Sequence, residues 1–341
     1  METDRRLVPA WLWTLVAVGI LGVVIALAVS DRRREPGPSL QFDVTPFAAV
    51  DPATVNFRQA ARFPVTVTKP AALARGRGGR MFVAGEDAVV AMDANGKETV
   101  RYAVKGTPDC LAEAPDGRIF LGMRDHVEAI DPKGAPVAAW PALDGQAWIT
   151  ALAADEQNLY MADAGNRVIW RFDHAGAMLN KIGERRPGDA DAGFVIPSPY
   201  FDVLLDPSGA LWAVNPGKHG FENYRPNGEL ISSWYRPGIN TEGFCGCCNP
   251  IHAAYRSDGS VVTMEKGLNR IKVYTPDAKL LGVVATADML GAPADAATSC
   301  QLETPVPDIA VDDQDRIWVL HGPWQAVLVY EQEKDREVSP R

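Results

Sequence analysis

The densest group of reactive side chains in this 341-residue chain lies in the segment Gly243-Phe-Cys-Gly-Cys-Cys-Asn-Pro-Ile-His252. Within eight residues it holds three thiols and one imidazole, from Cys245, Cys247, Cys248 and His252. Thiolate and imidazole are the ligands that soft metals such as copper(I) and zinc prefer. The spacing is not that of a zinc finger, because no second Cys-x-x-Cys pair follows and adjacent cysteines do not easily point at one ion. The segment therefore predicts a site for a soft metal, copper or zinc, or for a redox group.

The same thiols also suit disulfide bonds, which persist in oxidising compartments outside the cytosol. In that case Cys245 or Cys247 would pair with Cys300 farther along the chain. The chain has five cysteines, so at least one thiol stays outside any intramolecular pair. A disulfide between the adjacent Cys247 and Cys248 is a third interpretation, which would be strained and easily reduced.

Internal repeats indicate the fold that must position these residues. Six segments share one pattern of short apolar strands separated by Asp/Gly turns. The turn glycines Gly96, Gly134, Gly176 and Gly228 are spaced by 38, 42 and 52 residues, close to the roughly 40–50 residues of a four-stranded propeller blade. We therefore predict an all-β fold, a six-bladed β-propeller of four-stranded antiparallel blades over residues 55–335, followed by a short tail at 336–341.

The last repeat shows only three clear strands, so the N-terminal end of the domain must supply the fourth. Two segments are available for this, Val55-Asn-Phe-Arg and Phe63-Pro-Val-Thr-Val-Thr68. Either would close the ring and cover a strand edge that would otherwise be open.

One repeat carries a recognisable motif, Asp163-Ala-Gly-Asn-Arg-Val168 followed by Phe172-Asp173. It resembles the signature of the NHL repeat family, and the resemblance covers roughly residues 65–335. Membership of that family implies a six-bladed propeller. It implies no single function, because NHL propellers include protein- and RNA-binding modules, a lyase and relatives of lactonases.

Blade topology predicts where the reactive residues gather. In an up-and-down blade, the link to the next inner strand and the turn between the second and third strands lie on one face of the ring. All the cysteines fall on that face, with Cys110 and His252 at equivalent positions of two inner strands. We expect Glu265 close to His252, where it would orient the imidazole, with Cys110 and Asn249 supporting the same group of ligands. Alternatively, Glu265 is a turn acceptor or an ion-pair partner.

A second possible site is the central channel itself. Metal-dependent lactonases and NHL-type lyases hold a divalent ion there with acidic and amide ligands from several blades. Asp202, Asn215 and Asp308 could approach the channel, although this ring of ligands is incomplete.

The one long apolar segment, residues 9–29, carries no charge and has Trp11 and Trp13 at one end. About 20 such residues span a bilayer as a helix. We predict an N-terminal transmembrane anchor at residues 1–30, a linker at 31–54, and a propeller on the periplasmic side of a bacterial cytoplasmic membrane. A cleaved signal peptide is the alternative, because Ala26-Leu-Ala28 has the form of a cleavage site.

The overall composition excludes some functions. A net charge of −9 and an acidic isoelectric point near 5.2 argue against a nucleic-acid partner. No nucleophile-elbow, P-loop, His-Glu-x-x-His, dinucleotide or c-type haem motif is present. We predict a binding or accessory module whose cysteine-bearing face takes a protein partner, a soft metal or a redox group. The alternatives are a lactonase-like hydrolase or lyase that uses the channel, and a protein-interaction scaffold with structural disulfides.

Overall fold

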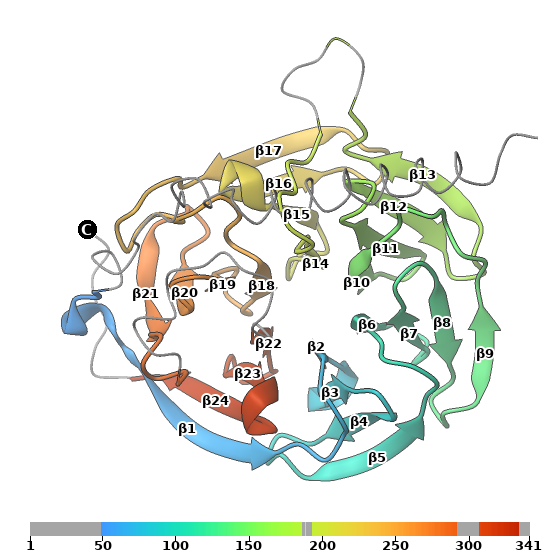
Figure 1. Cartoon of the computed structure of the whole chain (residues 1–341), viewed down its shortest axis with the longest axis horizontal. Helices are drawn as coiled ribbons and strands as arrows, with labels where there is room; N and C mark the ends of the chain where they lie inside the picture. The colour runs from blue at the N-terminus through green and yellow to red at the C-terminus, as the bar shows by residue number, and fades with distance from the viewer. Residues whose placement is uncertain (1–48, 186–187, 189–192, 292–306, 334–341) are drawn as a thin grey trace, which may run out of the picture. The chain divides into compact units, whose positions relative to one another are not determined.

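The structure is a computed structural model that describes residues 49–185, 188, 193–291 and 307–333. These residues form six four-stranded antiparallel sheets arranged as blades around a central axis (Figure 1). Each innermost strand contacts the innermost strands of the two neighbouring blades, which closes the ring. The predicted six-bladed propeller of four-stranded blades is confirmed.

The first three blades follow the chain from the inner strand to the outer one. Their strands are β2 (Ala72–Arg75), β3 (Met81–Ala84), β4 (Ala88–Met92) and β5 (Glu98–Ala103); β6 (Cys110–Glu113), β7 (Ile119–Gly122), β8 (Val127–Ile130) and β9 (Pro136–Ala139); and β10 (Ile149–Ala154), β11 (Asn158–Asp163), β12 (Val168–Asp173) and β13 (Met178–Ile182).

The other three blades have the same arrangement, with β1 as the outer strand of the last. Their strands are β14 (Val203–Leu205), β15 (Leu211–Asn215), β16 (Gly220–Tyr224) and β17 (Leu230–Tyr235); β18 (His252–Tyr255), β19 (Val261–Glu265), β20 (Arg270–Tyr274) and β21 (Leu280–Ala285); and β22 (Asp308–Val311), β23 (Ile317–His321), β24 (Ala326–Gln332) and β1 (Phe57–Pro64). Short 3-10 turns occupy Pro52–Thr54, Arg77–Gly79, Pro216–Lys218 and Gly322–Trp324.

The Asp/Gly turns seen in the sequence are the hairpins between the outer strands. In the first blade, one Asp93 side-chain oxygen accepts hydrogen bonds from the backbone N–H groups of Asn95 and Lys97. Gly96 has a φ of +75°, a left-handed conformation that glycine adopts without steric cost. The repeat is visible in the sequence because each blade needs this turn chemistry.

Apolar side chains on the two faces of each sheet pack against the neighbouring blades. One such cluster joins the last blade to the first through Trp318, Val327 and Val329 on one side and Leu73, Val83 and Val90 on the other, all of them buried. The core is therefore a set of layers between blades, and it leaves the axis of the ring open.

The ring is closed by β1, which pairs antiparallel with β24 from Phe57↔Gln332 to Pro64↔Ala326. The prediction that an N-terminal strand completes the last blade is confirmed. The strand overlaps the ends of both segments considered for this role, Val55-Asn-Phe-Arg and Phe63–Thr68.

The predicted membrane anchor at residues 1–30 and the predicted C-terminal tail at 336–341 lie outside the described residues. Within the part of the chain that the structure describes, no helix is both long enough and apolar enough to span a bilayer.

Candidate functional site at the mouth of the central channel

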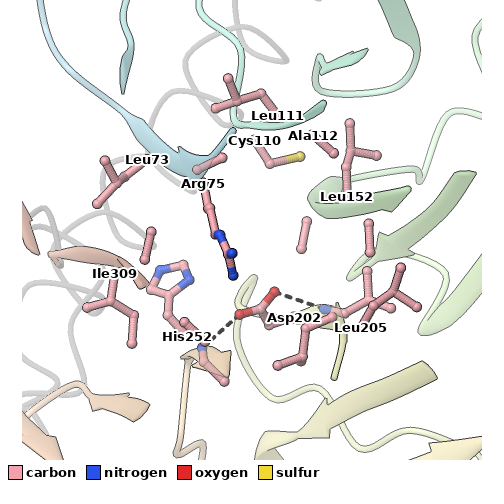
Figure 2. Close-up of a pocket in the computed structure, with 18 of the residues that line it drawn as sticks. Leu73, Arg75, Cys110, Leu111, Ala112, Leu152, Asp202, Leu205, His252 and Ile309 are labelled. Atoms are coloured by element: carbon pink, nitrogen blue, oxygen red, sulfur yellow. Dashed lines mark hydrogen bonds between the residues drawn. The ribbon is translucent and has the colours of Figure 1, made fainter. Parts of the chain in front are cut away.

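The axis of the propeller holds a cavity of about 610 Å³ lined by all six inner strands. Cys110, His252 and Asp308 are the first residues of their inner strands, and Asp202 directly precedes another. Thr150, near the start of β10, also lines the cavity. These side chains therefore form one level of the channel, although they come from five different blades. Figure 2 shows Cys110, Asp202 and His252 around this cavity.

Two aspartates at this level are held by backbone hydrogen bonds from neighbouring blades. Asp202 accepts one from Val203 in its own blade at 2.9 Å and one from Ala253 in the next blade at 2.8 Å. Asp308 does the same with Ile309 at 2.8 Å and Leu73 at 2.7 Å. Each carboxylate thus joins two inner strands, which fixes its position at the channel mouth.

His252 belongs to the blade between those of Asp202 and Asp308. Its Nδ1 atom lies 3.6 Å from Oδ1 of Asp308, an ion-pair distance longer than a hydrogen bond. On another side, the ring of Tyr200 meets the imidazole edge-on, with centroids 5.9 Å apart. The side chains of His252 and Asp308 remain 22% and 19% exposed, so both can reach a ligand in the channel.

Burial of these groups shifts their pKa values. Burial raises the pKa of Asp202 to about 6, with the His252 charge lowering it and the Asp308 charge raising it by smaller amounts. Burial also raises the pKa of Asp308, partly opposed by His252. The pKa of Cys110 is raised well above its ordinary value by burial and then by the Asp109, Asp202 and Asp308 charges. The channel thus holds a carboxyl group that exchanges its proton near neutral pH, as acid–base catalysis requires.

A second cavity, of about 420 Å³, shares Asp109, Thr150, His252 and Asp308 with the channel. It continues the channel outward past the side chains of Trp148 and Tyr200. His252 and Asp308 therefore line both cavities, whereas Asp202 lines only the channel cavity.

A pH titration of folding stability tests the protonation of Asp202. Because burial raises its pKa from 3.8 to about 6, the folded state holds this proton more tightly than the unfolded chain. The resulting stabilisation is absent above the folded pKa and greatest below the unfolded one. We expect the free energy of unfolding of the wild type, relative to Asp202→Asn, to fall between about pH 4 and 6 and then to level off.

Denaturant unfolding of both proteins at each pH measures this difference. Asp202→Asn also weakens a hydrogen bond, which changes the free energy of unfolding by the same amount at every pH. A difference that stays constant across this range would show that Asp202 does not hold a proton near neutral pH.

The cysteine-rich segment forms the link between β17 and β18. Cys245 and Cys248 are buried and Cys247 is exposed. The Cys247 and Cys248 sulfur atoms lie 3.4 Å apart. Cys300 lies outside the described residues. Among the residues that the structure describes, no group of three or more His, Cys, Asp or Glu side chains is arranged to hold a metal.

Asn249 holds this link in place and does not face the channel. Its Nδ2 donates to the carbonyl oxygens of Cys245 at 2.6 Å and Lys266 at 3.1 Å, and its Oδ1 accepts from the Lys266 N–H at 2.9 Å. Of the residues assigned to the site from the sequence, the structure brings His252 and Cys110 to the channel, while Cys245, Cys247, Cys248 and Asn249 stay in the link.

Glu265 does not take its expected place beside His252. His252 pairs across the sheet with Met264, and successive side chains along a strand point to opposite faces. Glu265 therefore faces away from His252. It is fully buried and bonds to Arg270 at 2.8 Å and Lys272 at 3.1 Å, which makes it an ion-pair partner.

Asn215 does not reach the channel either. It ends β15, a second strand, and is fully buried. Its Oδ1 accepts from the Val195 N–H and its Nδ2 donates to Glu222, both at 3.0 Å. The carboxylate beside His252 is instead Asp308, one of the residues predicted for the alternative site in the channel.

No protein-family model matches the sequence, and no curated protein sequence does. Solved structures do match. A streptogramin B lyase is 13% identical with a TM-score of 0.55, covering 83% of this chain and all of its own. Virginiamycin B lyase from Staphylococcus aureus is 13% identical with a TM-score of 0.52, covering 80% of this chain and 99% of its own.

A catalytically inactive histidine-to-alanine variant of the Staphylococcus aureus virginiamycin B lyase, with quinupristin, is 12% identical with a TM-score of 0.50, covering 80% of this chain and 99% of its own. At these identities the likeness establishes the propeller fold, a fold that hosts many unrelated activities. The chain is therefore a six-bladed β-propeller with structural neighbours among lyases of this kind.

Proposed function

We propose that the protein is a lyase-type enzyme that uses acid–base chemistry on a small molecule bound at the mouth of the central channel. The observation that carries the proposal is the position of His252, which lies in the channel with Asp308 at 3.6 Å and belongs to the blade next to that of Asp202. A histidine that lies beside a carboxylate and is open to a cavity is a common arrangement for a general base.

The geometry supports one division of roles. Nδ1 of His252 faces Asp308, so Nε2 is the ring nitrogen that would take a proton from the substrate. Asp202, with its pKa raised to about 6, would give a proton to the leaving group. In such an elimination the bond to the leaving group breaks, its electrons leave with it, and a double bond forms at the carbon that lost the proton. No water is consumed.

The structural neighbours favour the lyase over other channel chemistry. They are named as lyases, and one of them is described as catalytically inactive when a histidine is replaced by alanine. A metal-dependent lactonase would need several ligands converging on one ion, and the described residues hold no such group. The binding module predicted from the cysteine-rich segment has less support, because Cys245 and Cys248 are buried and Glu265 is bonded elsewhere.

Mass spectrometry of the products tests the proposal. The protein would be incubated with quinupristin and with a panel of cyclic esters and lactones. We expect conversion of at least one compound to a ring-opened product that has the same mass as the substrate and is separated from it by chromatography. Products heavier by one water would replace the lyase with a hydrolase, and failure of the whole panel to bind or react would count against the channel site.

We also propose that residues 9–29 anchor the propeller to the outer face of the bacterial cytoplasmic membrane, since this segment is apolar, uncharged and long enough to span it. Protease added to spheroplasts should then digest the propeller and leave a short membrane-bound stub. A cytoplasmic marker protein must stay intact as the control. Protection of the propeller to the same degree as the marker would place it in the cytoplasm.

A further inference from the structure

The link before β18 holds two adjacent thiols that the proposed lyase chemistry does not use. The sulfur atoms of Cys247 and Cys248 lie 3.4 Å apart. The two residues differ sharply in environment, because Cys247 is exposed whereas Cys248 is only 1% exposed. One thiol is therefore open to a reagent from solvent, and the other is covered directly beside it.

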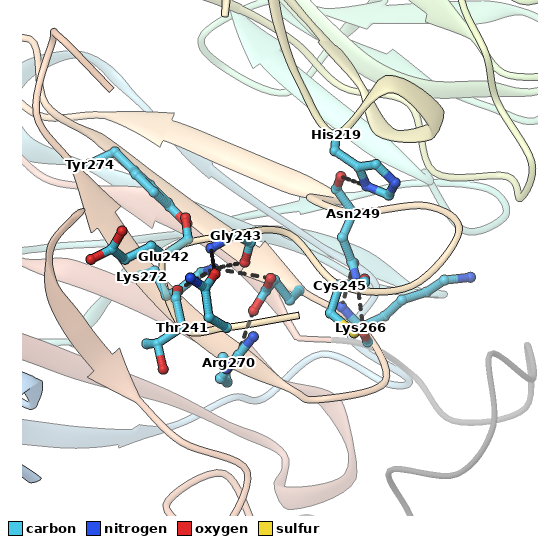
Figure 3. Close-up of polar contacts among 12 residues, drawn as sticks. His219, Thr241, Glu242, Gly243, Cys245, Asn249, Lys266, Arg270, Lys272 and Tyr274 are labelled. Atoms are coloured by element: carbon cyan, nitrogen blue, oxygen red, sulfur yellow. Dashed lines mark hydrogen bonds and ion pairs between the residues drawn. The ribbon is translucent and has the colours of Figure 1, made fainter. Parts of the chain in front are cut away.

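The protein holds this link from both sides. On the side that follows the thiols, Asn249 bonds to the backbone of Cys245 and Lys266. On the side that precedes them, Nζ of the buried Lys272 donates to the carbonyl oxygens of Thr241 at 3.0 Å and Gly243 at 2.8 Å (Figure 3). Because both ends of the link are fixed, bringing the two sulfurs together costs little conformational entropy.

The chemistry of two adjacent thiols favours redox exchange over metal binding. Structural zinc sites use four ligands, and no group of three or more ligating side chains is found among the described residues. A disulfide between neighbouring residues is also unlike a structural one. Their Cα atoms are about 3.8 Å apart across a trans peptide, whereas ordinary disulfides span about 4.4–6.8 Å. Strained disulfides of this kind are readily reduced, which suits a reversible reaction.

We propose that Cys247 and Cys248 form a reversible redox-active dithiol that is oxidised by exchange with an external disulfide such as glutathione disulfide. The exposed Cys247 thiolate attacks one sulfur of that disulfide and releases the first thiol, which leaves a mixed disulfide on Cys247. Cys248 then attacks the Cys247 sulfur, forms the Cys247–Cys248 bond and releases the second thiol. Two electrons pass from the dithiol to the external disulfide, and the two thiol protons go to the released thiols.

This redox site is independent of the proposed lyase activity, so its test needs no substrate. The full-length protein, kept in detergent, would be equilibrated at a series of ratios of reduced to oxidised glutathione, quenched in acid and alkylated. Trypsin should release residues 219–256 as one peptide, because prolines follow Arg225 and Arg236. This peptide carries Cys245, Cys247 and Cys248.

We expect a single two-electron transition in which the peptide loses two hydrogens and keeps one alkylated thiol, at Cys245. Dithiothreitol should reverse it. The transition should disappear completely in Cys247→Ser and in Cys248→Ser, and persist in the matched control Cys245→Ser, with circular dichroism confirming that each variant is folded. Four results would overturn the proposal. They are a disulfide between this peptide and Cys300, a disulfide that includes Cys245, a mixed disulfide with glutathione that persists, and alkylation of all three thiols at every glutathione ratio.

Discussion

Replacing Glu265 with glutamine should lower the free energy of unfolding by about 3–5 kcal/mol, because it removes one partner of a buried charge cluster. The Glu265 and Lys272 side chains are fully buried and that of Arg270 is 1% exposed. Glutamine keeps the shape of the side chain, so the loss reports the missing charge beside two buried cations. Denaturant unfolding monitored by circular dichroism gives the value.

The pH dependence of this loss gives a second readout. Burial lowers the pKa of Lys272 from 10.5 to about 8, and the Glu265 charge opposes that shift. Without Glu265 the lysine should release its proton more easily. Part of the lost stability should therefore return as the pH rises toward about 8, because the uncharged amine no longer needs a counter-ion.

An exposed ion pair supplies the matched control. Arg225 and Glu229 lie 3.0 Å apart with side chains 58% and 61% exposed. Such pairs contribute about 0–1 kcal/mol, so Glu229→Gln should leave the free energy of unfolding nearly unchanged. Equal losses in the Glu265 and Glu229 variants would show that the buried cluster contributes no more than a surface pair.

Deleting residues 55–68 should leave the domain largely unfolded at room temperature. The deletion removes β1 and exposes the edge of β24. It also removes Phe57, Val65 and Val67, which are all buried and each contribute about 1.5–3 kcal/mol on burial. Their sum approaches the whole stability of a typical domain, about 5–15 kcal/mol.

Circular dichroism and urea unfolding of the truncated chain check this prediction. Deleting residues 49–54 is the control, because these residues precede β1 and supply none of the three buried side chains. If the chain without residues 55–68 unfolded cooperatively at the wild-type midpoint, β1 would not be what closes the ring.

The fold could be predicted because each blade repeats the same local chemistry. The aspartate and glycine of each hairpin turn are required by backbone geometry, so they recur in the sequence at the spacing of the blades. The position of the closing strand β1 was predicted less accurately, since two segments of the sequence were candidates. Along β1 most side chains are exposed or only partly buried, so it lacks the apolar pattern that marks an inner strand.

The candidate site was predicted only in part, because its residues converge from distant positions. The cysteine-rich segment stood out through local density alone. By contrast, the channel residues are far apart in the sequence: His252 follows Asp202 by 50 residues, and Asp308 follows His252 by 56. Each spacing is about the length of one blade, and only this spacing indicated that the three residues occupy equivalent positions in successive blades. Glu265 was misplaced because one step along a strand reverses the face of the sheet. Nothing in the sequence marked Tyr200, which reaches His252 from a link between blades.

A kinetic comparison of His252 and cysteine variants tests the channel site most directly. On whichever compound the wild type converts, His252→Gln should lower kcat/KM by about 100- to 10,000-fold, the usual contribution of a general base. The double variant Cys247→Ser/Cys248→Ser, assayed under reducing conditions, should match the wild type. If instead His252→Gln kept wild-type activity while the cysteine variant lost it, the chemistry would lie in the cysteine-bearing link and not at the mouth of the channel.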